Sequence, residues 1–155
     1  MNLFLGITSL VLCTFLGAFY AKKYTNRKNF YMNFSSFNSK IKNEVAFTQN
    51  SIVSISKNIS FETNDFNDCV KKVFCDNTPF EFDKKYITKD EIEYFSSYLK
   101  TIGTSDRETQ IQYIESASKY LNEKLAKAEE NEKKYKKAYV KLGFLIGLIL
   151  LIVLL

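Results

Sequence analysis

Charge is confined to the interior of this chain. All 39 charged residues lie between Lys22 and Lys141, so residues 1–21 and 142–155 carry no charged side chain. Long apolar stretches outside a charged centre are typical of membrane proteins, because water does not tolerate so much unbroken apolar surface. The pattern predicts two membrane-embedded ends around an aqueous domain of 120 residues, which is long enough to bury a core.

The first end is an uninterrupted apolar run over residues 3–21. Nineteen residues at helical rise span roughly 28 Å, close to the hydrocarbon thickness of a bilayer. A cleaved signal peptide is the alternative, but it needs a basic start, and no Lys or Arg precedes the run. We therefore predict a retained transmembrane helix over residues 1–21.

The second end is the aliphatic run 142–155, which alone covers only about 21 Å of helix. Extension back to Ala138 gives a span of roughly 27 Å, with Lys141 able to reach the interface through its long stem. A buried core helix is the alternative, and the adjoining lysine cluster argues against it. We predict a second transmembrane helix over residues 138–155, in which Gly143 and Gly147 form a GxxxG pattern suited to close helix packing.

Basic residues flank both predicted spans, on the side of the chain centre. Since positive charge favours the cytoplasmic side, residues 22–137 are predicted to be a cytoplasmic domain. The other 13 basic and all 17 acidic residues lie in 29–132, so that region has a net charge of −4 although the whole chain has +5. The basic flanking residues are Lys22, Lys23, Arg27, Lys28, Lys133, Lys134, Lys136, Lys137 and Lys141.

The centre contains few chain-breaking residues and has helical periodicity. Thr88 and Glu91 form a capping box that opens a helix, and Gly103 is placed to stop it. Ser105 and Glu108 form a second capping box, after which no proline or glycine occurs until Gly143. One continuous helix is therefore predicted from residue 106 into the membrane.

The remaining helices are predicted from apolar spacing alone. An amphipathic helix is expected over 30–45, a shorter one over 52–59 that could also be a strand, another over 66–74, and a short capped turn at Thr78–Glu81. The fold class is all-α, a cytoplasmic bundle of about six helices between two membrane helices. The stripe of the first amphipathic helix is Phe30, Phe34, Phe37, Ile41 and Val45.

Composition argues against several kinds of chemistry. There is no histidine, so the commonest general base and neutral metal ligand is missing. The spacing of Cys69 and Cys75 matches neither a zinc site nor a redox motif, and both are expected to be buried small apolar residues. We predict no catalytic residues, no metal, no cofactor, no small-molecule substrate and no nucleic-acid partner. A membrane-tethered hydrolase remains an alternative if carboxylates cluster in a pocket.

One segment resembles a known family. Residues 102–110 read Ile-Gly-Thr-Ser-Asp-Arg-Glu-Thr-Gln, and they are followed by Lys134-Tyr135, Tyr139 and Leu142-Gly-Phe-Leu145 before the aliphatic tail. Together with the N-terminal span before Lys22-Lys23-Tyr24, this pattern is similar to the stage III sporulation protein AB family. Residues 27–87 share only its hydrophobic pattern.

The resemblance implies a non-enzymatic scaffold in a secretion-like complex of the mother-cell membrane that faces the forespore. It implies contacts with the other subunits of that complex and with its cytoplasmic ATPase, through a domain similar to F-type platform proteins of type II secretion. A holin-like or pore-associated membrane protein and an adaptor of another secretion system are the alternatives. Membrane lipid is the further expected partner. The candidate partner-contact residues, which we call the elbow, are Gly103, Ser105, Asp106, Arg107 and Gln110.

Overall fold

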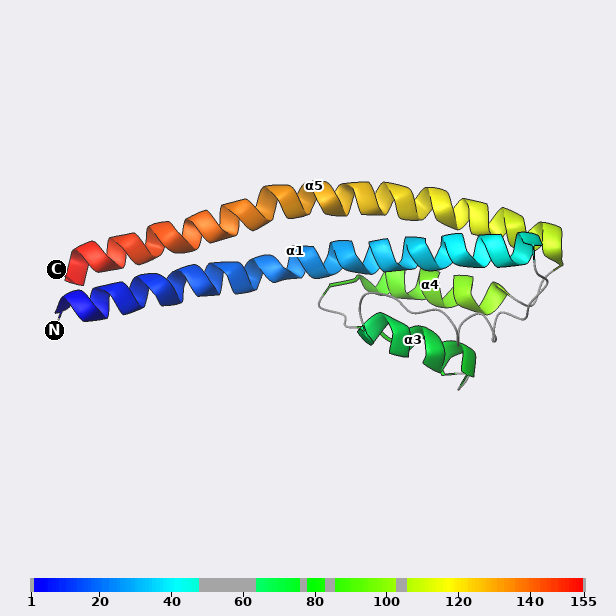
Figure 1. The fold of residues 1–155 in the computed structure, drawn as a ribbon, viewed down its shortest axis with the longest axis horizontal. Helices are drawn as coiled ribbons and strands as arrows, with labels where there is room; N and C mark the ends of the chain where they lie inside the picture. Colours follow the sequence, from blue (N-terminus) through cyan, green and yellow to red (C-terminus); the bar gives the residue numbers. More distant parts are fainter. Residues whose placement is uncertain (1, 48–63, 76–77, 83–85, 103–105, 155) are drawn as a thin grey trace. The chain divides into compact units, whose positions relative to one another are not determined.

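The computed structural model describes residues 2–47, 64–75, 78–82, 86–102 and 106–154. Within these ranges the chain is all helical apart from short connections, which confirms the predicted fold class. The described residues form four helices: α1 (Asn2–Phe47), α3 (Asn64–Cys75), α4 (Lys89–Thr101) and α5 (Arg107–Leu154) (Figure 1). Two compact units can be separated, one formed by Met1–Lys28 with Lys127–Leu155, the other by Asn29–Ala126. We call them the end unit and the central unit.

The expected count of about six helices is not supported. Thr78–Phe82 has no regular structure, so the predicted capped turn there is wrong, and the predicted helix over 52–59 lies outside the described residues. The first predicted span and the amphipathic helix that follows it are one helix, α1. No glycine or proline occurs between Gly17 and Phe47, so nothing in the backbone ends the helix where the side chains change from apolar to charged.

The predicted capping box at the start of α4 is confirmed. The Glu91 amide donates to the Thr88 hydroxyl at 3.3 Å, and the Thr88 amide donates to the Glu91 carboxylate at 3.0 Å. The predicted box at the start of α5 is wrong by one residue. Since α5 begins at Arg107, Asp106 is its N-cap, and the Thr109 amide donates to the Asp106 carboxylate at 3.1 Å.

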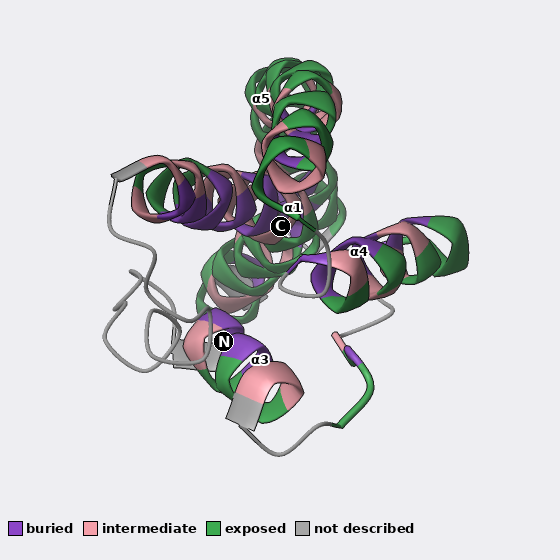
Figure 2. Cartoon of the chain, turned by 90° about the vertical axis from the view of Figure 1, so that its right-hand side faces the viewer, coloured by how far each residue is buried: buried purple, intermediate pink, exposed green. Residues whose placement is uncertain are grey.

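The core of the central unit is aromatic and centred on α1. All five residues of the predicted stripe on α1 are at most 8% exposed. Phe34 has its ring centroid 4.3 Å from that of Phe95 on α4 and 5.7 Å from that of Phe66 on α3. Each helix therefore carries one buried stripe, with exposed residues on its other faces (Figure 2).

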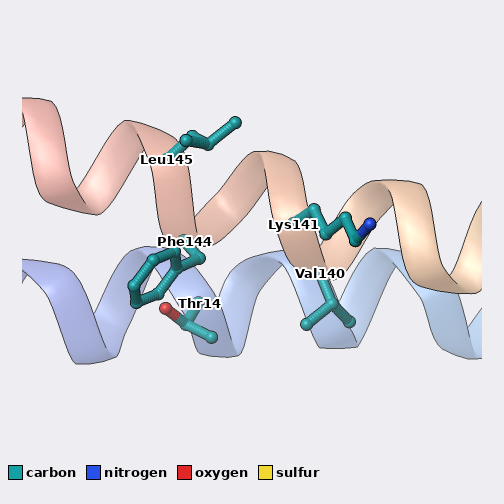
Figure 3. Close-up of a pocket in the computed structure, with 5 residues that line it drawn as sticks. All are labelled: Thr14, Val140, Lys141, Phe144 and Leu145. Carbon is teal, nitrogen blue, oxygen red and sulfur yellow. The ribbon is translucent and has the colours of Figure 1, made fainter.

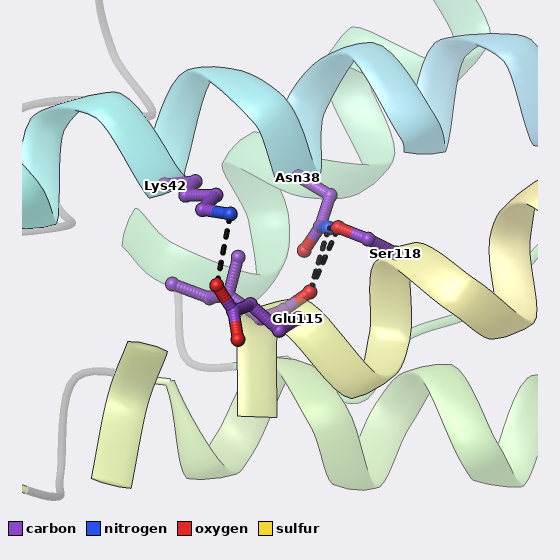
Figure 4. A network of polar contacts seen from close by, with 5 residues as sticks. Asn38, Lys42, Glu115 and Ser118 are labelled. Carbon is purple, nitrogen blue, oxygen red and sulfur yellow. Dashed lines mark hydrogen bonds and ion pairs between the residues drawn. The ribbon is translucent and has the colours of Figure 1, made fainter. Parts of the chain in front are cut away.

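Buried polar groups connect the helices of the central unit. The Asn38 side-chain amide donates to the Ile114 carbonyl at 3.0 Å and to the Ser118 hydroxyl at 2.7 Å (Figure 4). The Asn38 side-chain oxygen accepts from the Tyr98 hydroxyl. The same figure shows Lys42 paired with Glu115 at 3.1 Å. Asn38 thus connects α1 with both α4 and α5, and it fixes their register in a way that apolar contacts alone would not.

Candidate functional site: the paired helix ends

The end unit is built from the first part of α1 and the last part of α5, which run antiparallel. Contacts between them are spaced along the pair, from Gly6 with Leu151 to Lys28 with Glu132. Their outward faces are apolar and exposed, and they include the following large side chains: Phe4, Leu5, Ile7, Val11, Leu12, Phe15, Leu16, Phe19, Leu142, Phe144, Leu145, Ile146, Ile149, Leu150, Ile152 and Val153. An exposed apolar surface of this extent indicates contact with lipid or with other proteins.

The two helices meet backbone to backbone at three glycines. A Cβ atom on Gly17 would lie 2.5 Å from the Tyr139 carbonyl oxygen, and one on Gly143 would lie 2.5 Å from the Cys13 carbonyl oxygen. A Cβ atom on Gly147 would lie 2.8 Å from the Leu10 Cα atom. No real Cβ fits at these distances, so the approach of the helices requires glycine at all three positions.

The structure thus places Gly143 and Gly147 of the predicted GxxxG pattern against α1. Their counterpart on α1, Gly17, was not identified as a packing residue from the sequence. The signal lay in the small residues Gly6, Cys13 and Gly17 along one face of α1, but sequence alone did not show that this face meets α5.

Hydroxyl side chains in the apolar part of α1 are satisfied by their own helix. Thr8 donates to the Leu5 carbonyl at 2.9 Å, Ser9 to the Gly6 carbonyl at 2.8 Å and Thr14 to the Leu10 carbonyl at 2.8 Å. Such bonds remove the need for water, which makes these residues compatible with a hydrocarbon environment.

A groove of about 370 Å³ lies on the side of this helix pair. It is lined by Thr14 of α1 and by Val140, Lys141, Phe144 and Leu145 of α5 (Figure 3). Lys141 is its only charged lining residue, and its side chain extends along α5 away from Phe144 and Leu145.

Three tyrosines pack where the apolar ends give way to charged residues. The Tyr24 ring stacks on Tyr135 with centroids 4.9 Å apart, and it lies 5.9 Å from the Tyr139 ring. Desolvation and the neighbouring Tyr139 raise the pKa of Tyr24 above its ordinary value, so it stays neutral at physiological pH. Tyrosine is favoured at the bilayer interface, where its ring is shielded and its hydroxyl is wet.

Glu132 is the central polar residue of the end unit. It accepts from Lys28 at 2.8 Å and from the Thr25 hydroxyl at 2.8 Å, and it contacts Lys136 at 3.4 Å. The hydrogen bond from Lys28 is the main reason that the pKa of Glu132 falls to about 2. Its side chain is only 13% exposed, so this contact holds α1 to α5 at the charged end of the pair. The contact with Lys136 follows from the i,i+4 spacing on α5, whereas the two contacts that cross between helices have no local sequence signal.

The other basic flanking residues lie mostly on the surface. Lys28 forms an ion pair with Glu132. The exposed basic residues include Lys22, Lys23, Lys133, Lys134, Lys137 and Lys141. The end unit therefore combines an apolar surface with an adjoining, strongly basic one.

The elbow residues have structural contacts as far as they are described. Asp106 is exposed and caps α5, and its hydrogen bonds with Thr109 lower the pKa of its carboxyl. Arg107 donates to the Ala46 carbonyl near the end of α1, where a cation complements the helix dipole. The Gln110 amide donates to the Asp106 carbonyl at 2.9 Å, while Gly103 and Ser105 lie outside the described residues.

The central unit contains one buried carboxylate that sequence reasoning treated only as a cap. Glu91 is 3% exposed and accepts from the Tyr31 hydroxyl at 2.6 Å and from Lys124 at 3.2 Å. Partial burial alone would lower the pKa of Lys124, but the bond to Glu91 and the nearby Tyr120 raise it. No group of three or more possible metal ligands occurs among the described residues.

Cys69 is buried, in accordance with its prediction as a small apolar residue, and its thiol donates to the Glu81 carbonyl at 2.8 Å. Desolvation raises the pKa of this thiol to about 11, so it is a poor nucleophile near neutrality. The Cys75 side chain lies outside what the structure describes.

By length and composition, one helix in the described part of the chain could cross a membrane, within Phe4–Ala46 of α1. The helices thus define an all-α protein with a candidate membrane span near its N-terminus. A model of the stage III sporulation protein AB family matches residues 63–155, which is more than half of the chain. The chain belongs to this family, which makes it a component related to the sporulation membrane complex. No curated protein and no solved structure matches it.

Proposed function

We propose that this protein is a non-enzymatic scaffold of the sporulation membrane complex, anchored in the membrane by both ends. The observation that carries the proposal is the end unit, where two helices with apolar outward faces pack through glycine and continue into tyrosines and lysines. Helices that associate in lipid use this combination, because lipid offers no hydrophobic drive for large side chains to be buried.

Both ends are proposed to span the bilayer, over residues 1–21 and 138–155. The C-terminal part of α5 supports this through its exposed aliphatic residues, such as Ile149, Ile152 and Val153, which are 59%, 62% and 75% exposed. Surface of this kind would be strongly unfavourable in water. By the positive-inside rule, the basic flanking residues support a cytoplasmic location for residues 22–137.

The mother-cell membrane that faces the forespore is the proposed location, and the cytoplasmic ATPase of the complex is the proposed partner of the central unit. Family membership supports the location. Support for docking comes from the exposed start of α5, where Asp106 and Glu108 lie on the surface next to the capped end of α1. A surface held by Arg107 and by the cap at Asp106 is preorganised for a partner.

Topology is tested by labelling single cysteines in a variant that lacks all three native cysteines. Ser116→Cys lies on an exposed position of the central unit. We expect an impermeant maleimide to label it only after the cells are opened, whereas a cysteine appended after Leu155 is labelled in intact cells. Labelling of Ser116→Cys from outside would overturn the orientation.

Docking is tested by co-purification of the full chain with the ATPase in mild detergent. Asp106→Lys with Glu108→Lys should abolish co-purification, and Glu129→Lys with Glu130→Lys is the matched charge control on α5. Ion leakage from cells that express the chain, without any associated ATPase, would favour the holin-like alternative.

A further inference from the structure

The groove of the end unit lies across the boundary between apolar and charged residues. Phe144 and Leu145 form its walls on one side of Lys141 and are 45% and 58% exposed. The hydroxyl of Thr14, on the opposite helix, donates to the Leu10 carbonyl of α1. The groove therefore offers an apolar surface bordered by the side chain of Lys141, whose ammonium group extends along α5 away from Phe144 and Leu145 (Figure 3).

Lysines continue along the same face of α5 beyond the groove. Lys137 and Lys134 lie four and seven residues before Lys141, one and two helical turns away. All three are exposed, whereas Lys28 and the likewise exposed Lys136 pair with Glu132. No acidic residue occurs in 133–155, so nothing near the groove attracts a cationic headgroup.

We propose that this groove binds one anionic phospholipid, with an acyl chain against Val140, Phe144 and Leu145 and the phosphate between Lys141 and Lys137. The order of groups in the site, apolar walls and then lysines, matches the order of groups in the lipid. Lys134 extends the positive field toward the rest of the headgroup and is itself held near the Tyr135 ring, 5.5 Å from the centroid. This inference rests on the proposed membrane insertion of both helix ends.

A lysine near an anionic surface contributes about a fivefold gain in binding, and the gain is screened by salt. A phospholipid seated between α1 and α5 would also cover part of the exposed apolar surface of the pair.

The test uses the full chain reconstituted in phosphatidylcholine bilayers that contain a trace of spin-labelled lipid. Electron paramagnetic resonance gives the fraction of labelled lipid immobilised by the protein. We expect spin-labelled phosphatidylglycerol to be immobilised several-fold more than spin-labelled phosphatidylcholine, and the preference to fall in high salt. Lys137→Gln with Lys141→Gln should remove most of this preference.

Two matched variants separate the parts of the site. Lys89→Gln with Lys119→Gln removes two exposed lysines of the central unit and should change nothing. Val140→Trp fills the groove without altering charge and should lower immobilisation of phosphatidylglycerol. An unchanged signal in Val140→Trp would overturn the groove as the acyl-chain site, and an unchanged preference in the lysine variant would overturn the headgroup site.

Soluble glycerol phosphate distinguishes a lipid site from a free phosphate site. We expect it to leave immobilisation unchanged, and displacement of the lipid would overturn the assignment to phospholipid. Resistance of the reconstituted chain to carbonate extraction is measured first. Extraction of the chain would contradict the proposed membrane anchoring. An integrated chain without a lipid preference would contradict only the phospholipid site.

Discussion

The central unit and the end unit use the same two long helices and hold them together in opposite ways. In the central unit large rings fill the space between helices, and Phe34, Phe37, Phe66 and Phe95 are fully buried. In the end unit the large side chains point outward, and the helices touch at Gly17, Gly143 and Gly147. Large apolar side chains thus lie between the helices in the central unit and on their outward faces in the end unit.

The difference reflects the solvent for which each region is suited. Water drives large apolar side chains together, because burial removes their surface from water at about 25 cal/mol per Å². Lipid supplies no such drive, and helices then gain most from close backbone packing and from polar contacts such as the one at Glu132. Each prediction below alters one of these two kinds of contact.

The largest effect is expected in the aromatic core. Phe34→Ala removes a ring that contacts α3 and α4 and leaves a cavity, so the free energy of unfolding should fall by about 3–5 kcal/mol. Chemical denaturation of the full chain in detergent, followed by circular dichroism, measures the loss. Tyr113→Ala is the control, because Tyr113 is 48% exposed, and an equal loss in both variants would contradict the assigned core.

The glycine contacts should come next. Gly143→Val introduces side-chain atoms where even a Cβ would lie 2.5 Å from the Cys13 carbonyl, so α1 and α5 must separate. We expect the substitution to destabilise the packing of the end unit by an amount near the upper end of roughly 1–3 kcal/mol, without destabilising the central unit. Distances between spin labels on Leu12 and Leu145 should increase, while the central unit stays folded.

Gly6→Ala is the graded control for that substitution. A Cβ on Gly6 would meet the Leu151 side chain at 3.3 Å, and a side chain can give way where a carbonyl cannot. Equal distance changes in Gly6→Ala and Gly143→Val would show that the backbone contact is not what holds the pair.

A smaller loss is expected at the buried carboxylate. Glu91→Gln keeps the shape of the side chain but removes the charge that Lys124 and Tyr31 contact, so stability should fall by about 2 kcal/mol. When Tyr31→Phe is combined with Glu91→Gln, the loss of stability should be smaller than the sum of the two single losses, since the two residues interact directly. Fully additive effects in the double mutant would contradict the hydrogen bond.

Local signals explain what the sequence could predict about this fold. The capping box at Thr88 and the Phe30 stripe depend on residues three or four positions apart, and both are confirmed. The start of α5 was predicted one residue early, because Ser105 and Asp106 are both good N-caps and only the helix geometry selects Asp106. The length of α1 was missed because the charges after Ala21 mark a change of environment and do not break the backbone.

Contacts between residues far apart in sequence could not be predicted in the same way. Tyr31 and Glu91 are 60 residues apart, and Thr25 and Glu132 are 107 apart. A glutamate in a capping box or an i,i+4 pair is fully explained by its own helix, so nothing in the pattern points to a second partner. The role of Gly17 was hidden for the same reason, because it depends on which face of α5 lies opposite.

The smallest and most specific effect is expected at Glu132, where a polar contact supplements the glycine contacts. Its pKa is lowered to about 2 from an ordinary value near 4.5, so its stabilisation is complete above pH 4.5 and is lost as the pH falls toward 2. Glu132→Gln should cost about 1 kcal/mol at neutral pH and nothing near pH 2. The difference in thermal stability between wild type and variant, measured across this range, isolates Glu132 from the other carboxyls. Lys28→Gln should remove most of that pH dependence, whereas Glu129→Gln, at an exposed position of the same helix, should keep it. A constant difference across the range would mean that the charge of Glu132 does not hold α1 to α5.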